Sequence, residues 1–217
     1  VPFPAFEVFR ILPDAWSRAL IHGVLGADVV GLHTLDYARH FLRSADRLAG
    51  VETTAGEVRH GSRVTHVDAF PLGVDFPRHA TAADRPDVAA ALEALRGPLG
   101  DRRVVLSVDR LDYTKGICGR ISAFEAFLER SPHWRGRVTL VVVAVPSRER
   151  IESYQLMRTQ VEQAVGRING RFGSVAWAPV VYQFRALDFP ELAALYLRAD
   201  VALVTPLRDG MNLIAKE

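Results

Sequence analysis

Positively charged side chains follow a long apolar segment near the middle of the chain. The segment "RVVLSVD" runs directly into Arg110 and Lys115, and Gly116 follows the lysine. Arginine offers a planar fork and lysine a point charge, so two cations on one short loop suit a diphosphate group. The glycine lets the backbone turn there or approach a ligand closely. Alternatively, Arg110 pairs with Asp109 or Asp112 at the surface.

A second arginine follows the longest apolar run of the chain, "VTLVVVAV". Here Arg148 comes directly after Ser147. We expect Ser147 to cap a helix that begins at Arg148. Because a cation is electrostatically disfavoured at a helix N-terminus, a bound anion would account for this arginine. A solvated first helical turn accounts for the same residues equally well.

Two carboxylates follow a third apolar segment, "DVALVTP". Asp209 lies in the next loop, and a helix is predicted to begin near Met211 and to carry Glu217. Seven residues separate the two carboxylates, so we expect them on roughly the same side. Carboxylates in these places can accept hydrogen bonds from sugar hydroxyls and a ribose diol, while the helix N-terminus offers amides to phosphate. Taken alone, the acidic pair is equally typical of a solvated surface.

Alternating strands and helices must position these loops. Several predicted strands are continuous runs of Val and Leu, which indicates burial on both faces, as in a parallel sheet covered by helices. The fold class is therefore α/β. The predicted strands are residues 28–33, 64–70, 103–109, 138–145, 180–184 and 200–206. The predicted helices are residues 14–25, 35–48, 88–95, 119–129, 148–168 and 190–198.

The periodicity lapses in "DFPRHATAADRP", residues 75–86, which is typical of a connection between two α/β units. We therefore predict two domains, residues 1–78 and residues 79–217. In open α/β sheets, ligands bind beyond the carboxyl ends of the strands, where loops and helix N-termini converge. Three charged strand ends together predict a nucleotide-sugar pocket better than they predict three unrelated surface groups.

Composition argues against several other classes of protein. The chain of 217 residues is 49% hydrophobic and 24% charged, which is typical of a globular protein. Its net charge of +2 is too small to predict a nucleic-acid or membrane partner, and no apolar run could span a bilayer. The seven histidines show no metal-ligand spacing, so we expect no metal site. The single cysteine, Cys118, fits a reducing compartment such as the cytoplasm.

Long motifs extend over the whole chain: "VPFP", "EVFRILP", "DYARHFL", "VDRLDYTKG", "VAVPSR", "GRINGRFG" and "TPLRDGMNLIAKE". In this order they resemble the trehalose-6-phosphate synthase family, the retaining glycosyltransferases of family 20. The resemblance implies a GT-B fold of two Rossmann-like parallel-sheet domains, both incomplete here. Residues 1–78 would be the C-terminal part of the acceptor-side domain, and residues 79–217 the first part of the nucleotide-sugar-binding domain.

The resemblance also implies roles for individual residues. Arg110 and Lys115 match the pair on the donor diphosphate, where they would be catalytic, stabilising the leaving group without a metal. Arg148 matches the arginine that holds the 6-phosphate of the acceptor. The other matches concern the donor. Leu187 falls where the family's backbone pairs with the base, Asp209 matches the carboxylate that contacts the glucose hydroxyls, and Glu217 matches the carboxylate that binds the ribose. The loop whose backbone reaches the sugar and phosphates is matched by Gly210, Met211, Asn212 and Leu213.

The implied reaction moves glucose from UDP-glucose or GDP-glucose to glucose 6-phosphate with retention, giving trehalose 6-phosphate. The acceptor would attack on the face from which the nucleotide leaves, so no enzymatic nucleophile is needed, in keeping with the lack of a Ser-His-Asp arrangement. No cofactor is implied, and homo-oligomerisation is left open. The family's histidine before "VPFP" falls upstream of Val1, and the chain stops abruptly after "LIAKE". We therefore expect an internal fragment that is inactive by itself.

Three alternative functions fit parts of the pattern. A sister enzyme such as glucosylglycerol-phosphate synthase would use another acceptor, and only upstream residues separate the two. A related pseudo-glycosyltransferase couples cyclitols, but the intact "DRLDYTKG" and "DGMN" speak against it. A non-catalytic homologue that senses sugar phosphates is disfavoured because both cations and both carboxylates are retained. The donor base, whether uridine, guanosine or adenosine, depends on backbone contacts that a sequence does not show.

Overall fold

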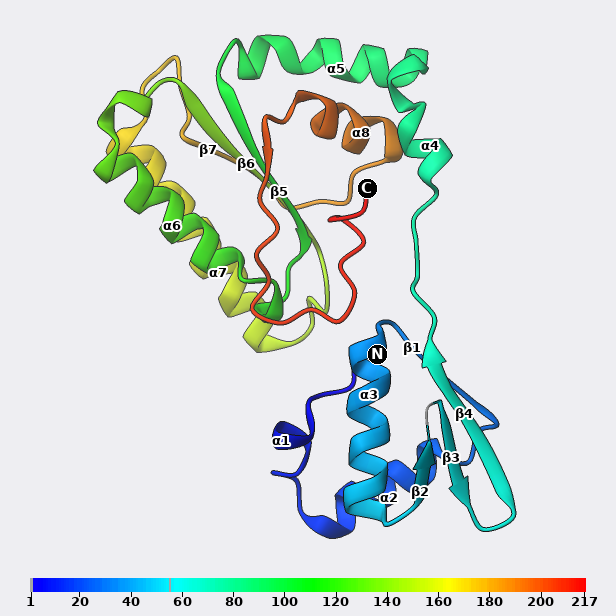
Figure 1. Ribbon diagram of the computed structural model, residues 1–217. Coiled ribbons are helices and arrows are strands. Elements are labelled where there is room, and N and C mark those ends of the chain that lie inside the picture. The colour runs from blue at the N-terminus through cyan, green and yellow to red at the C-terminus, as the bar shows by residue number, and fades with distance from the viewer. Residues whose placement is uncertain (1, 55) are drawn as a thin grey trace. The chain divides into compact units, whose positions relative to one another are not determined.

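The computed structural model describes residues 2–54 and 56–217, which divide into two compact units (Figure 1). The division falls after Gly73, whereas the sequence placed the boundary after residue 78. Helix α4 (Phe76–Ala80) accounts for the difference because it packs on the second unit. The Arg78 guanidinium lies 4.0 Å from the centroid of the Phe189 ring, and the His79 ring lies 5.3 Å from it.

The first unit has a mixed sheet in the order β1-β4-β3-β2. Strands β1 (Val29–Leu32) and β4 (Arg63–Ala69) pair in parallel, as predicted. Strands β2 (Glu52–Thr54) and β3 (Glu57–His60) pair antiparallel, and β3 also pairs antiparallel with β4. The sequence pattern did not predict these two strands. Their segments "ETT" and "EVRH" are short and mostly polar, so they give no apolar run that would predict a strand.

Helices cover one face of this sheet. They are α1 (Phe6–Phe9), α2 (Asp14–Val24) and α3 (Leu35–Ser44), and a π-helical turn, Ala45–Ala49, continues α3. Phe41 of α3 is fully buried against the strands, and Tyr37, one turn earlier, packs at the edge of the same cluster. The two side chains, one helical turn apart, form an apolar stripe that faces the sheet.

The second unit is built on a parallel sheet in the order β7-β6-β5-β8. Its central strands, β5 (Arg103–Arg110) and β6 (Val138–Val145), are nearly continuous apolar runs that are buried on both faces, as predicted. Strands β7 (Val180–Gln183) and β8 (Val201–Ala202) are shorter. All four strands point the same way, so the loops that follow them emerge at one edge of the sheet.

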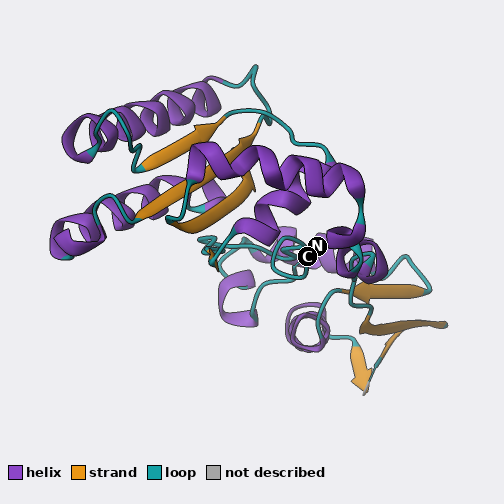
Figure 2. Cartoon of the chain, turned by 90° about the horizontal axis from the view of Figure 1, so that it is seen from above, coloured by secondary structure: helices purple, strands orange, loops and turns teal. Residues whose placement is uncertain are grey.

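Helices lie on both faces of this sheet (Figures 1 and 2). Helices α6 (Ile117–Arg130) and α7 (Glu152–Phe172) pack together on one face, around a core that includes Ile121 and Leu140. Helices α5 (Pro86–Leu99) and α8 (Phe189–Arg198) cover the other face. Short 3-10 turns at Ala82–Asp84, Tyr113–Lys115 and Pro132–Trp134 complete the connections.

Two predicted helix starts at the sheet edge are wrong. Helix α7 begins at Glu152 instead of Arg148, and Ser147 does not cap it, so residues 146–151 form a loop. The helix expected near Met211 is absent from residues 203–217, which form turns. There the Asp209 carboxylate accepts a hydrogen bond from the Met211 backbone N–H at 3.4 Å, which competes with regular helix formation.

Candidate functional site

The loop after β5 is a capped turn that presents Lys115. The Asp112 carboxylate accepts hydrogen bonds from the backbone N–H of Thr114 at 2.9 Å and from its hydroxyl at 2.8 Å. Gly116 follows with a φ of 69°, and a Cβ there would lie 2.8 Å from the carbonyl oxygen of Thr205. Only glycine therefore allows this turn to approach the loop after β8 so closely.

Backbone hydrogen bonds join the loops after β5 and β8. The Thr114 carbonyl oxygen accepts from the backbone N–H of Leu207 at 2.8 Å and from that of Arg208 at 3.3 Å. The two strands pair in parallel further back, with Val105 opposite Val201. The chain therefore places the predicted diphosphate loop against the predicted sugar loop.

Lys115 and Asp209 form an ion pair between these two loops. Their side chains are mostly buried, with exposed fractions of 12% and 16%. Burial disfavours the charged form of Asp209, but hydrogen bonds from Lys115 and from the Met211 backbone outweigh burial and lower its pKa. The Asn212 amide also donates to this carboxylate, at 3.0 Å. Asp209 is thus held as a carboxylate beside the lysine.

A second ion pair, buried more fully than the first, lies next to the Lys115 turn. The Arg120 guanidinium donates to the Asp109 carboxylate at 2.5 Å, and both side chains are almost fully buried. It also donates to the Ser107 hydroxyl, to the Lys115 carbonyl oxygen and, at 3.3 Å, to the Leu203 carbonyl oxygen. Arg120 therefore connects β5, the Lys115 turn and the end of β8.

The buried carboxylate beside Lys115 is neutralised chiefly by that arginine. Burial raises the pKa of Asp109, while the hydrogen bond and the charge of Arg120 oppose the increase. Lys115 lies further from Asp109, at 3.9 Å. The sequence analysis did not single out Arg120. One signal was present, because Arg120 interrupts the apolar positions Ile117, Ile121 and Phe124 on the helix face that packs against the sheet.

Arg110 ends β5 with an exposed side chain. Within residues 2–54 and 56–217 its guanidinium has no hydrogen-bond or ion-pair partner. The surface pairing considered for it is absent because Asp109 binds Arg120 and Asp112 binds Thr114. Arg110 is therefore available to an anion.

Arg148 lies in the loop after β6 and has a φ of 50°. No other non-glycine residue in the described part of the chain has a positive φ, and strain of this kind gathers at functional sites. Its guanidinium donates to the Tyr154 hydroxyl at 2.9 Å, and that hydroxyl donates to Asp112 at 3.1 Å. The loops after β5 and β6 are thus joined through one tyrosine.

The remaining predicted residues surround these loops at the same edge. Leu187 lies between β7 and α8 and is half-buried against the α8 side of the core. Glu217 accepts a hydrogen bond from the Tyr196 hydroxyl of α8 at 2.5 Å. The helix predicted to carry Glu217 is absent from residues 203–217, so this residue is held by its contact with α8 instead. Burial raises the pKa of Tyr196, and that hydrogen bond raises it further. Gly210, Met211, Asn212 and Leu213 form the turn between the two carboxylates.

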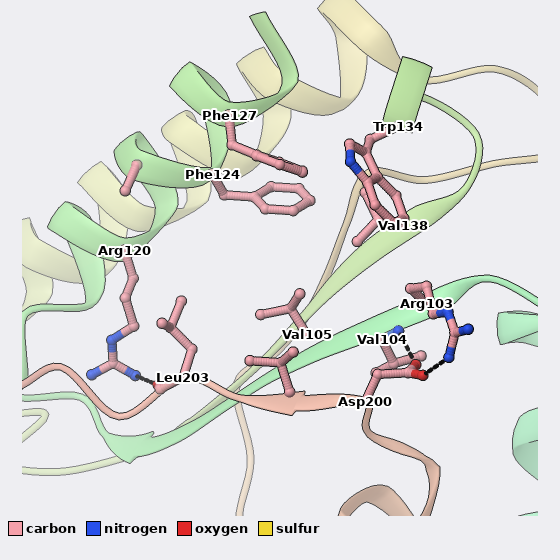
Figure 3. A pocket seen from close by; sticks show the side chains of 12 residues that line it. Arg103, Val104, Val105, Arg120, Phe124, Phe127, Trp134, Val138, Asp200 and Leu203 are labelled. Atoms are coloured by element: carbon pink, nitrogen blue, oxygen red, sulfur yellow. Dashed lines mark hydrogen bonds and ion pairs between the residues drawn. The ribbon is translucent and has the colours of Figure 1, made fainter. Parts of the chain in front are cut away.

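A cavity of about 560 Å³ lies elsewhere in the second unit, beside helix α6 (Figure 3). Its charged side chains are already paired, Arg103 with Asp200 and Arg120 with Asp109. A sugar-phosphate site needs convergent polar groups that are free to orient the ligand, so this cavity does not have the required chemistry. Its apolar walls include Val105, Phe124, Phe127, Trp134, Val138 and Leu203.

The described residues contain neither a candidate membrane span nor a candidate metal cluster. No helix in residues 2–54 and 56–217 has both the length and the apolar character needed to cross a membrane. The same residues include no group of three or more His, Cys, Asp or Glu side chains that could hold a metal ion.

A parallel sheet with helices on both faces, and with cations and carboxylates at its carboxyl edge, is the architecture of α/β proteins that bind ligands beyond the ends of their strands. The chain belongs to glycosyltransferase family 20, whose model matches residues 1–217. Its structural neighbours confirm the α/β, GT-B fold class predicted from the sequence.

Three proteins illustrate this similarity. A bifunctional trehalose-6-phosphate synthase/phosphatase of Thermoproteus tenax is 47% identical over the whole chain, which covers 30% of that protein. A UDP-forming α,α-trehalose-phosphate synthase from Burkholderia xenovorans, in complex with glucose-6-phosphate, has a TM-score of 0.90 and 36% identity. An E. coli structure described as "trehalose-6-phosphate" bound with UDP-2-fluoro glucose has a TM-score of 0.89 and 34% identity.

The match covers the whole of this chain but only part of its relatives. All residues of the chain align with each of the two solved structures, of which they cover 48%. The chain therefore spans about half the length of the solved relatives that it matches.

Proposed function

We propose that the protein to which this chain belongs transfers glucose from a nucleotide diphosphate to glucose 6-phosphate with retention, forming trehalose 6-phosphate. The observation that carries the proposal is the site at the carboxyl edge of the second sheet, where Lys115 meets Asp209 and the exposed Arg110 ends β5. The relatives support both substrates, because one is described with glucose-6-phosphate and another with UDP-2-fluoro glucose. They favour UDP-glucose over GDP-glucose as the donor.

In this proposal the loops after β5 and β8 bind the donor. Arg110 and Lys115 bind its diphosphate, and Asp209 accepts hydrogen bonds from hydroxyls of its glucose. Lys115 and Asp209 neutralise one another before the donor arrives. The diphosphate then provides a replacement anion for the lysine, and sugar hydroxyls provide replacement donors for the carboxylate. The exchange preserves charge balance in a largely buried place.

The remaining donor contacts come from the backbone and from one carboxylate. The turn formed by Gly210, Met211, Asn212 and Leu213 offers amides to the sugar and phosphates. Glu217 binds the ribose. Its carboxylate accepts a hydrogen bond from the hydroxyl of Tyr196, which lies on α8. The backbone near Leu187, between β7 and α8, pairs with the base.

Arg148 binds the 6-phosphate of the acceptor. Its side chain is exposed, and its strained backbone positions it at the edge of the loop after β6. A guanidinium is suited to this task because it can bind two phosphate oxygens at once. The loop joins the donor loop through Tyr154, so the two substrates are held by connected structures.

The chemistry follows from positioning and charge. The anomeric hydroxyl of glucose 6-phosphate attacks the anomeric carbon of the donor glucose on the face from which the nucleotide leaves. The bond between that carbon and the diphosphate oxygen breaks, and the departing phosphate oxygen takes the proton of the attacking hydroxyl. Arg110 and Lys115 stabilise the charge that develops on the diphosphate, as preorganised cations do in a site shielded from water. No protein nucleophile and no metal takes part.

A donor and acceptor panel on the full-length protein tests the proposal, with nucleotide release as the measurement. We expect release from UDP-glucose with glucose 6-phosphate and formation of trehalose 6-phosphate. Faster release with glycerol 3-phosphate would identify the sister activity, and binding of sugar phosphate without release would identify a sensing homologue. Either result would overturn the proposal. A cytoplasmic location and homo-oligomerisation stay predictions.

A further inference from the structure

The Tyr154 hydroxyl lies between Arg148, which the proposed function places on the acceptor phosphate, and Asp112, which caps the turn that presents Lys115. It accepts a hydrogen bond from the Arg148 guanidinium at 2.9 Å and donates one to the Asp112 carboxylate at 3.1 Å. We propose that Tyr154 is a positioning residue that orients Arg148 for the acceptor phosphate and ties it to the donor loop. This inference rests on the proposed function of Arg148 as the phosphate anchor.

Arg148 needs an external partner because its own loop does not hold its side chain. The side chain is exposed and follows a strained backbone. Within the described ranges, 2–54 and 56–217, its only hydrogen bond is the one to Tyr154. An arginine on such a loop samples many rotamers, and fixing it before the ligand arrives reduces the entropy lost on binding.

Tyr154 is suited to this task because it is itself immobile. It lies in the first turn of helix α7 and is only 5% exposed. Its ring makes an edge-to-face contact with the Tyr113 ring, at 6.2 Å between centroids. The Arg148 guanidinium carbon lies 5.7 Å from the Tyr154 ring centroid, so the arginine lies close to the ring as well as to the hydroxyl.

The hydroxyl also links Arg148 to the turn that presents Lys115. A tyrosine hydroxyl has one proton, which it gives to Asp112, and its lone pairs are then free for the arginine. The same Asp112 carboxylate accepts from the backbone N–H and the hydroxyl of Thr114. One hydroxyl group therefore stands between the phosphate anchor and the cap of the donor turn.

The chain offers a matched control in Tyr182 of β7. Its hydroxyl is buried but has no hydrogen-bond partner among the described residues. Burial, aided by the charge of Glu162, raises its pKa to about 12. Tyr182→Phe therefore removes a buried hydroxyl without removing a hydrogen bond, whereas Tyr154→Phe removes two.

Initial-rate kinetics of the full-length protein test the inference, with UDP release as the measurement. We expect Tyr154→Phe to raise KM for glucose 6-phosphate about tenfold, as for a lost hydrogen bond to a charged group. KM for UDP-glucose should change less than about twofold, which is less than half of the free energy that a typical hydrogen bond contributes. Tyr182→Phe should leave both constants unchanged, and thermal unfolding should show that both variants fold.

A double-mutant cycle with Arg148→Ala separates positioning from a general structural effect. If Tyr154 acts through Arg148, Tyr154→Phe adds almost nothing once the arginine is gone. If Tyr154→Phe raises the acceptor KM by the same factor with and without Arg148, the inference about Tyr154 is overturned while the proposed function stands. The same holds if Arg148→Ala raises the acceptor KM and Tyr154→Phe leaves it at the wild-type value. An unchanged acceptor KM in Arg148→Ala would overturn the proposed phosphate anchor, and the inference with it.

Discussion

Lys115 and Asp209 form an ion pair although 94 positions separate them in the sequence. The pair exists because β5 and β8 are parallel neighbours, so that the loops following them emerge at the same edge of the sheet. Each residue belongs to a motif that suits part of a sugar nucleotide. Their contact indicates that the two motifs serve one site.

Asp209→Asn tests this pair. The substitution keeps the shape of the side chain and removes its charge, so sugar hydroxyls and Lys115 lose a strong acceptor. We expect kcat/KM for UDP-glucose in the full-length protein to fall at least about tenfold. Asp36→Asn is the control, since Asp36 is an exposed carboxylate on α3 that pairs with Arg39. Equal activity of the two variants would contradict the role of Asp209.

Arg110→Ala tests the exposed guanidinium at the end of β5. Loss of a preorganised charge at the leaving group lowers kcat by about 100-fold or more in comparable sites, and we expect a loss of that order. The thermal midpoint should not change, because the side chain is exposed and unpaired in the described structure. Arg96→Ala, at an exposed arginine of α5, serves as the control for general loss of positive charge. A wild-type kcat in Arg110→Ala would refute the assignment.

Arg120→Met tests the buried support of the site. The variant leaves the Asp109 carboxylate buried without its main partner. Breaking a buried ion pair in this way costs about 3 to 5 kcal/mol of unfolding free energy, which urea denaturation measures. Adding Asp109→Asn removes the unpaired charge and should recover part of the loss. If Arg120→Met alone costs less than about 1 kcal/mol, the pair is not the support that its geometry indicates.

The pH dependence of stability tests the cap formed by Asp112. Burial disfavours the charged form, but hydrogen bonds from Thr114 and Tyr154 and the charge of Arg148 outweigh it and lower the pKa below the ordinary value of 3.8. A carboxyl with a lowered pKa in the folded state stabilises the protein above its unfolded pKa, and the effect is lost as the pH falls through the folded pKa.

Asp112→Asn should therefore lower the thermal midpoint most near neutral pH. The difference from the wild type should shrink as the pH falls from 3.8 through the lower pKa of the folded carboxyl, because the folded wild-type carboxyl loses its charge there. Thermal unfolding of both proteins from about pH 2 to about pH 7 measures this window. A difference that grows toward acid would show that the carboxylate does not stabilise the fold.

Sequence patterns alone predicted the framework of the site. Continuous apolar runs identified β5 and β6 as strands buried on both faces, and the charged residues directly after them marked the edge where a ligand would bind. The motifs also identified the family, which the match over residues 1–217 shows. These features could be predicted because each depends on residues that are close together in the chain.

Only the tertiary structure showed how the side chains connect. It paired Lys115 with Asp209, placed Arg120 beneath them, and put Tyr154 between Arg148 and Asp112. It also replaced the helix expected near residue 211 with turns. Such contacts join residues that are distant in sequence, and a local pattern does not specify them. The physical reason is that burial and hydrogen-bond geometry, which decide the partner of each polar group, arise only once the strands and helices have packed.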